Sequence, residues 1–397
     1  MTQRAPAGTG STAQYGNNDI ELARAEVIVC RAPLAQPVVT AFGAMRDRPA
    51  VLLRLADRHG AHGWGEVWCN FPASGAEHRA RLLADTVLPL ALGRLLRPAD
   101  ARAGLEAQLR VLALQTGEPG PLAQALAALD IALWDLAARR AGLPLARLLR
   151  AGAPAAVPVY ASGINPDAAP ERIAASRAAG YSRFKVKVGF GRDRDLAAVA
   201  AARAALAPGE TLLLDANQAW DRDTAIAMAA ALEAHSPGWL EEPLAADAPP
   251  EHWQALARST SIPLAAGENL RGDAAFAEAL SAGALAVLQP DACKWGGVSG
   301  CLAVARAALA AGRRYCPHYL GGGVGLMASA HLLAAAGGDG WLEVDVNPNP
   351  LREGLAQPFP AIRDGAMALP AAPGLGIEPD PEVLQRYTVL RLDVAAQ

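Results

Sequence analysis

The feature that most constrains the fold is a unit that repeats from residue 158 onward. Each unit has a short run of strand-forming residues, a polar or glycine-containing turn, and an alanine-rich helix. Strands that alternate with helices indicate a parallel sheet, and eight parallel strands can close a barrel. The eight runs read PVYASG, RFKVKVG, TLLLDANQ, GWLEEP, IPLAAGEN, ALAVLQPD, RYCPHYL and GWLEVDVN. We therefore predict an α/β barrel over residues 151–350.

The residues on either side of the barrel region have other patterns. Residues 20–60 read as three short antiparallel strands, and two stretches with apolar residues at helical spacing follow them. We expect residues 20–150 to form a separate α+β domain. Residues 1–19 are small and polar without an apolar core, which predicts a disordered tail and no secretory signal. Residues 351–397 are rich in proline and glycine, and we expect them to pack back on the N-terminal domain.

Composition narrows the classes of partner. The 397 residues include 36 Lys and Arg against 39 Asp and Glu, a net charge of −3, with no basic block and no apolar run long enough to span a bilayer. These features argue against nucleic acid and membranes and favour a small-molecule partner. The five cysteines are scattered without CxxC spacing, which fits a reducing compartment, so we expect a cytoplasmic protein.

Ionisable residues recur near the ends of seven successive runs. The steps between them are 28, 26, 27, 23, 27 and 25 residues, and each step is one strand plus one helix. All seven side chains should therefore emerge on the rim where barrel enzymes carry their chemistry. The seven residues are Lys187, Asp215, Glu241, Glu268, Asp291, His318 and Glu343.

Three consecutive runs end in acids, namely Asp215, Glu241 and Glu268. Carboxylates that converge without Cys or His are hard oxygen ligands, and they suit an octahedral Mg²⁺ that keeps positions for water or substrate. The alternative is a set of salt bridges to neighbouring lysines. Glu242 directly follows Glu241, so strand alternation sends it to the other face and makes it the poorer ligand.

Two further pairs of ionisable residues lie on the same runs. One is a pair of lysines, and the other is a histidine with a carboxylate. Lys185 and Lys187 lie two residues apart and should point to the same side of their strand, either toward buried anions or toward solvent at a sheet edge. His318 follows Asp291 by one unit, and a neighbouring carboxylate would fix its tautomer and raise its basicity. Such a pair suits general acid/base catalysis.

Several motifs together resemble the mandelate racemase/muconate lactonizing enzyme family of the enolase superfamily. The match covers most of the chain, because ALAALDIALWDLAARRAGLPLARLL also resembles the helix that leads from the family's capping domain into its barrel. Each motif alone is weak, and seven in order at barrel spacing are specific. They are KVK, DAN, EEP, GEN, PDACKWGG, PH and LE, at residues 185–187, 215–217, 241–243, 267–269, 290–297, 317–318 and 342–343.

The resemblance implies a modified (β/α)₇β barrel with an N-terminal α+β capping domain whose loops close over the site. It implies Mg²⁺ as cofactor, held by Asp215, Glu241 and Glu268, with the metal binding a substrate carboxylate and stabilising an enediolate. Lys187 becomes one base, and Asp291 with His318 becomes the opposite one. Because the family is often oligomeric, we expect a homo-oligomer.

The sixth run departs from the muconate-lactonizing pattern, which places a base lysine where this chain has Asp291. The departure favours the mandelate racemase-like subgroup, in which Glu343 matches an acid that hydrogen-bonds the substrate carboxylate. Asn217 lies on the same face as Asp215 and is a candidate substrate contact. Lys294 either borders the site or lies at the surface.

The lysine pair has separate expected roles. Lys185 is expected to stay charged, to lower the pKa of Lys187, and to contact the substrate carboxylate.

Two bases allow dehydration of a sugar acid to a 2-keto acid, or racemisation or epimerisation of a 2-hydroxy acid. We favour dehydration, because many racemase-like members of the family are acid-sugar dehydratases. A more distant alternative is a Schiff-base aldolase that uses a strand lysine, which would leave the three rim acids without a role. Specificity is expected in the capping loops at residues 32–49 and 66–79, with candidates Thr40, Phe42, Trp68 and Asn70.

Overall fold

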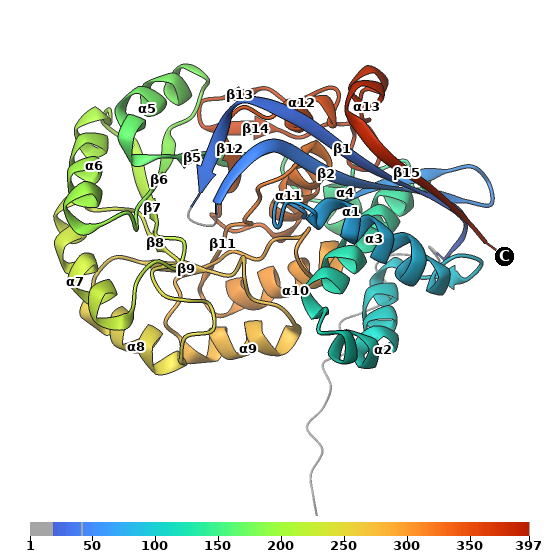
Figure 1. The fold of residues 1–397 in the computed structure, drawn as a ribbon, viewed down its shortest axis with the longest axis horizontal. Coiled ribbons are helices and arrows are strands. Elements are labelled where there is room, and N and C mark those ends of the chain that lie inside the picture. The colour runs from blue at the N-terminus through green and yellow to red at the C-terminus, as the bar shows by residue number, and fades with distance from the viewer. Residues whose placement is uncertain (1–18, 41–42, 397) are drawn as a thin grey trace, which may run out of the picture.

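Eight parallel strands follow one another between residues 156 and 345, and seven helices connect them (Figure 1). The strands are β5 (Ala156–Ile164), β6 (Arg183–Lys187), β7 (Thr211–Asp215), β8 (Leu240–Glu241), β9 (Leu264–Ala266), β10 (Val287–Leu288), β11 (Arg314–Tyr315) and β12 (Leu342–Asp345). The helices are α5 (Ala169–Ala178), α6 (Arg192–Ala205), α7 (Arg222–Leu232), α8 (Pro250–Ser259), α9 (Asp273–Ala282), α10 (Gly297–Ala310) and α11 (Gly323–Ala336). The computed structural model describes residues 19–40 and 43–396.

The strands pair in chain order from β5 to β11, and β12 pairs with β5. The remaining seam is bridged where the Trp341 backbone N–H donates to Sγ of Cys316, at 3.3 Å. Residues of β7 such as Leu212 and Leu214 are fully buried, as expected for a parallel sheet covered by helices. The predicted (β/α)₇β barrel is confirmed.

A second, antiparallel sheet lies outside the barrel. Its strand order is β15–β1–β2–β3, with β4 paired to β1. Its strands are β1 (Ile20–Thr40), β2 (Gly43–Asp57), β3 (His62–Val67), β4 (Leu95–Leu96) and β15 (Thr388–Ala395). Helices α1 (Gly75–Leu82), α2 (Pro98–Thr116), α3 (Pro119–Arg140) and α4 (Leu145–Leu149) accompany it. Helix α3 approaches β3 so closely that a Cβ on Gly65 would lie 2.0 Å from the Ala128 carbonyl oxygen. The predicted α+β capping domain is confirmed.

The first two strands are longer than the three short strands that the sequence predicts. Pairing continues beyond a register shift between Pro33 and Val38 and ends where Thr40 meets Gly43. The resulting hairpin arches over the open end of the barrel (Figure 1). The predicted loop 32–49 is therefore mostly the end of a β-hairpin. Phe42 lies outside the described residues, and Thr40 is described only as the last residue of β1.

The C-terminal segment packs on both domains. It contains α12 (Pro350–Gly354), β13 (Ile362–Arg363), β14 (Ala366–Ala368) and α13 (Pro381–Tyr387) before β15. Strand β14 pairs antiparallel with β5 of the barrel, and β15 pairs antiparallel with β1 of the capping sheet. The predicted tail covers residues 1–19, of which residues 1–18 lie outside the described part of the chain.

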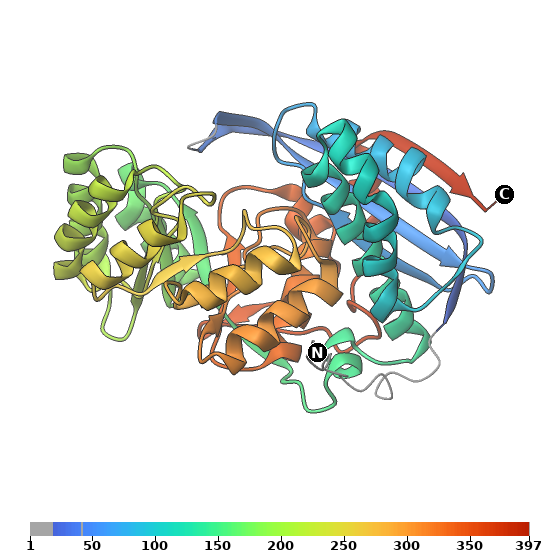
Figure 2. The ribbon, with the colours of Figure 1, turned by 90° about the horizontal axis from the view of Figure 1, so that it is seen from below.

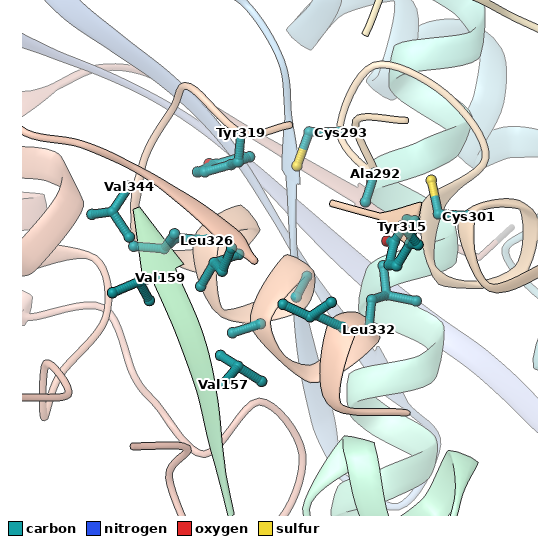
Figure 3. Close-up of a cluster of buried hydrophobic side chains, with 14 of the residues drawn as sticks. Val157, Val159, Ala292, Cys293, Cys301, Tyr315, Tyr319, Leu326, Leu332 and Val344 are labelled. Carbon is teal, nitrogen blue, oxygen red and sulfur yellow. The ribbon is translucent and has the colours of Figure 1, made fainter. Parts of the chain in front are cut away.

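The capping domain contacts one side of the barrel. Helix α3 packs against α10, and β3 packs against α11 (Figure 2). Leu326 and Leu332 of α11 in turn face Val157 and Val159 of β5 in the buried core (Figure 3). The sequence indicated no apolar run long enough to span a bilayer, but among the described residues α3 alone is long and apolar enough to do so, and most of it is buried within the protein.

Candidate active site

The strand ends bring the predicted ionisable residues side by side at one rim. The parallel register aligns Lys187 with Asp215, and Asp215 with Glu241. Nζ of Lys185 lies 3.6 Å from Oδ2 of Asp215, and Nζ of Lys187 lies 2.5 Å from the same oxygen. The lysine pair therefore points toward buried carboxylates and is not a solvated stripe.

The pKa of Lys187 is raised, whereas the sequence predicted that Lys185 would lower it. Burial has the largest effect on this pKa and favours the neutral amine, and the Lys185 charge acts in the same direction. The charges of Asp215 and Glu241, with the hydrogen bond to Asp215, outweigh both effects. Lys185 does lower the pKa of Lys187, as predicted, but the prediction left out Asp215 and Glu241, which turn the net shift into a rise.

Lys185 is fully buried and joins several acids. Its Nζ lies 2.5 Å from Oε1 of Glu241 and 2.6 Å from Oε1 of Glu343. Burial lowers the pKa of Lys185, but these two carboxylates raise it well above its ordinary value. Lys185 therefore stays charged, as predicted. Its predicted contact with substrate gains no support, because protein carboxylates surround the ammonium and Lys185 does not border the cavity described below.

Two further side chains donate hydrogen bonds to Glu241. Its Oε2 accepts hydrogen bonds from Nε1 of Trp239 at 3.1 Å and from Nε2 of Gln289 at 2.8 Å. Burial raises the pKa of Glu241 to about 7, with Lys185 opposing and Asp215 adding to the rise. This crowding of acids is what a cation would relieve.

His318 follows β11 and contacts acids through both ring nitrogens. Nδ1 lies 2.8 Å from Oδ2 of Asp291, and Nε2 lies 2.5 Å from Oε2 of Glu268. Oδ1 of Asp291 accepts from the Cys293 backbone N–H at 2.7 Å, which orients the carboxylate. Burial lowers the pKa of His318, but Glu268 and Glu343 raise it well above its ordinary value. The two flanking acids therefore favour the protonated imidazole, which can donate from both nitrogens.

A cavity of about 280 Å³ lies between the rim and the capping domain. Predicted residues from both domains border this cavity. Asp215, Glu241 and Asp291 are buried and do not border it. The predicted residues that border it are Lys187, Asn217, Glu268, Lys294, His318 and Glu343 from the barrel, and Trp68 and Asn70 from the capping domain.

The sequence left Lys294 at the site or at the surface, and the structure places it at the site. Its Nζ lies 3.3 Å from Oε1 of Glu268, 3.2 Å from Oδ1 of Asn269, and 4.7 Å from the centre of the Trp68 ring. Lys294 thereby connects a predicted metal ligand with a capping-domain aromatic. A cation over an indole face is attracted by the ring quadrupole.

Glu343 and Asn217 are also held in place. Oε1 of Glu343 accepts from the Ser162 hydroxyl at 2.5 Å, and Oε2 accepts from the Tyr319 backbone N–H at 3.1 Å. Burial raises the pKa of Glu343, but Lys185 and His318 lower it to about 2. The Asn217 backbone N–H donates to Oδ1 of Asp215 at 2.9 Å.

Sequence reasoning missed several residues that border the cavity. Some lie near strand ends, so the rule that found the charged residues could have found them: Ser162 is among the last residues of β5, and Asn269 and Asn347 follow β9 and β12. Arg48 lies on β2 and reaches Asp345 at the end of β12, with Nη2 2.7 Å from Oδ2. That ion pair joins residues far apart in the sequence, and no spacing rule could have found it.

The donor set of the three predicted ligands fits Mg²⁺, because it consists of buried carboxylates at consecutive strand ends. In the described part of the chain, no three acidic, histidine or cysteine side chains converge as a preformed metal cage. Each acid instead contacts a cation, Asp215 through Lys187, Glu241 through Lys185, and Glu268 through His318. Glu242 is buried and borders a second cavity, between α8 and α9, in keeping with its expected orientation to the other face.

Comparison with known proteins identifies the family of this chain. Residues 23–150 match the model of the mandelate racemase/muconate lactonizing enzyme N-terminal domain, and residues 168–383 match that of the enolase C-terminal domain-like family. The chain belongs to the mandelate racemase/muconate lactonizing enzyme family.

Three members of this family illustrate the similarity. A crystal structure of a mandelate racemase/muconate lactonizing enzyme from Bordetella bronchiseptica RB50 is 53% identical with a TM-score of 0.87, over 93% of this chain and 99% of that one. L-Talarate dehydratase from Polaromonas sp. JS666, complexed with Mg and L-glucarate, is 30% identical with a TM-score of 0.82, over 95% and 100%. D-Galactarolactone cycloisomerase of Agrobacterium fabrum is 35% identical over 68% of this chain and 75% of its own length.

Proposed function

We propose that this family member is a Mg²⁺-dependent hydro-lyase that removes the proton α to the carboxylate of a sugar acid and expels the β-hydroxyl as water. The observation that carries the proposal is that Lys187 and His318 border one cavity, from β6 and from the segment after β11. A base and an acid are thereby available to one bound molecule. The Mg-bound dehydratase among the relatives supports the same class.

Each side chain has a defined role in this reaction. Lys187, once deprotonated, takes the proton from C2. The imidazolium of His318 gives a proton to the C3 hydroxyl, which leaves as water, and the resulting enol becomes a 2-keto acid. Asp291 keeps His318 oriented through Nδ1. Glu343 borders the cavity as the substrate-facing acid.

Asp215, Glu241 and Glu268 would hold Mg²⁺, which supplies positive charge to the substrate carboxylate as negative charge builds on it. Amide side chains border the same cavity and can pair with several hydroxyl groups, as a sugar acid requires. They are Asn70, Asn165, Asn217, Gln218, Asn269 and Asn347.

The second candidate is racemisation or epimerisation, and the same pair of residues favours it. If Lys187 removes the C2 proton and His318 returns one to the other face of that carbon, the product is the epimer and no water leaves. The two reactions differ in which substrate atom His318 reaches. The predicted homo-oligomer and cytoplasmic location stay predictions.

A panel of aldonic and aldaric acids in D₂O with Mg²⁺ tests the proposal. We expect 2-keto acid to form from at least one acid, activity to be lost on addition of EDTA, and Mg²⁺ to restore it. Deuterium at C2 with inversion and no keto acid would identify the epimerase instead. Chelator-resistant activity that borohydride traps on Lys187 would refute both and support the aldolase.

A further inference from the structure

Glu66 of the capping domain is a buried carboxylate that the reaction does not use. It lies on β3 and is 2% exposed. Its Oε1 accepts from the Gly322 backbone N–H at 2.5 Å, and its Oε2 accepts from the Gly325 backbone N–H at 2.9 Å. Among the described residues, its hydrogen-bond donors are the backbone N–H groups of Gly322 and Gly325, the Tyr319 hydroxyl lies close by, and none of these groups is a cation. Burial without a cation raises the pKa of Glu66, and the hydrogen bonds from the Gly322 and Gly325 amides oppose this rise by stabilising the carboxylate.

The backbone that Glu66 holds is the segment that follows His318. Residues 319–322 lead directly from the base to the first turn of α11. The Tyr319 side chain closes this segment, because its hydroxyl donates to the Gly322 carbonyl at 2.8 Å (Figure 3 shows Tyr319 beside α11). A Cβ on Gly322 would lie 2.7 Å from Oε1 of Glu66, so segment and carboxylate fit without spare room.

The same segment is also connected to His318 through Glu343. The Tyr319 backbone N–H donates to Oε2 of Glu343, and that oxygen lies 3.8 Å from Nε2 of His318. Asn70, also from the capping domain, donates from Nδ2 to the Leu320 carbonyl at 2.7 Å. A shift of the segment would therefore move both the backbone of His318 and the acid beside its ring.

We propose that Glu66 is a positioning residue for His318: through the Gly322 and Gly325 amides it fixes the segment that follows this histidine, so that the capping domain sets the orientation of the imidazole toward Asp291. Glu66 is not a catalytic residue, because it does not border the cavity. Misplacing a catalytic group by about 1 Å can cost ~100-fold in rate, which gives such positioning functional weight.

Asp195 provides a matched control on the other base. It is buried in the first turn of α6, and its carboxylate accepts from the Gly189 and Phe190 backbone N–H groups at 2.8 and 3.1 Å. Those two residues belong to the loop after Lys187. Asp195 thus does for the Lys187 loop what Glu66 does for the His318 segment, but from within the barrel.

The test is NMR of the full-length protein, which needs no substrate. The Nδ1 proton of His318, hydrogen-bonded to Asp291, should give a far-downfield signal, assigned by its absence in His318→Asn. We expect Glu66→Gln to shift or abolish this signal. In glutamine an NH₂ group replaces one carboxylate oxygen, so one backbone N–H would face a second donor and lose its acceptor. Gly322→Ala should do the same from the segment side while leaving the carboxylate in place, which keeps the test decisive if Glu66→Gln fails to fold.

Asp195→Asn should leave the His318 signal unchanged. An unchanged signal in folded Glu66→Gln or Gly322→Ala would overturn the proposal, and so would an equal shift in Asp195→Asn. Any effect of Glu66 on catalysis rests on the proposed function, but its effect on the NMR signal of His318 does not. Failure of the dehydratase assay and failure of the positioning role can therefore be told apart.

Discussion

His331 offers a quantitative test of the structure through the pH dependence of stability. It lies fully buried on α11, where Nδ1 accepts from the Ala146 backbone N–H at 3.1 Å and Nε2 donates to the Leu375 carbonyl at 3.2 Å. It thereby joins α4, α11 and the C-terminal segment. Burial lowers the pKa of His331 to about 4. We expect this neutral histidine to make the folded state sensitive to acid.

The sign follows from comparing the two states. An unfolded histidine has a pKa of about 6.5, so between pH 6.5 and 4 the unfolded chain binds a proton that the folded protein does not. The contribution of His331 is therefore complete above about pH 6.5 and is lost as the pH falls toward 4. The pKa difference of about 2.5 units corresponds to about 3 kcal/mol of unfolding free energy, of which about 2.5 kcal/mol would be lost by pH 4.5.

The assay is urea unfolding of the wild type and of His331→Gln between pH 7.5 and 4.5. Other groups with raised pKa values, Asp130 and Glu241 among them, are present in both proteins and cancel in the difference. The advantage of the wild type should shrink by about 2.5 kcal/mol across this range. If the two curves of unfolding free energy against pH stay parallel, His331 is not buried in neutral form and the reasoning fails.

Three further changes test the site. Lys187→Ala should reduce α-proton exchange on one face of C2 by about 10²–10⁴-fold while calorimetry still detects Mg²⁺ binding, and unchanged exchange there would remove Lys187 as a base. Gln289→Leu should weaken Mg²⁺ binding by about 10-fold, because Glu241 loses a hydrogen bond that orients it, and calorimetric titration would show whether affinity is instead unaffected. Lys185→Met should cost about 3–5 kcal/mol in unfolding free energy, since Glu241 and Glu343 lose the cation between them, and a neutral effect in urea unfolding would contradict the buried ion pairs.

The barrel and its rim were predictable because both depend on a local repeat. One strand and one helix occupy a nearly constant length, so a residue such as Asp215 or His318 returns to the same rim each time. The hydrogen bond between Asp291 and His318 follows from that repeat. Asn269 and Asn347 obey it too, but the repeat was applied to the ionisable residues and, among the strand-end amides, only to Asn217.

Other features depend on contacts between distant parts of the chain. The hairpin of β1 and β2 was taken for a loop, since Pro33 and Pro37 interrupt the strand pattern and the pairing resumes beyond them. The lowering effect of Lys185 on the pKa of Lys187 was predicted, but the larger opposing effect of Asp215 was not, because the distance between Nζ and Asp215 cannot be read from spacing. Arg48 and Asp345 form a buried pair between two domains, which no local pattern signals.

The two candidate bases differ in what holds them, and this difference follows from how the domains meet. Glu66 and Asp130 of the capping domain bind backbone amides at the starts of α11 and α10, the helices that follow His318 and Asp291. The loop after Lys187 is held by Asp195 from the next helix of the barrel itself. The capping domain therefore holds the histidine side of the cavity, whereas the loop after Lys187 is held from within the barrel. In the proposed dehydration, that arrangement would place His318, the acid that must reach the C3 hydroxyl, in contact with the domain expected to recognise the substrate.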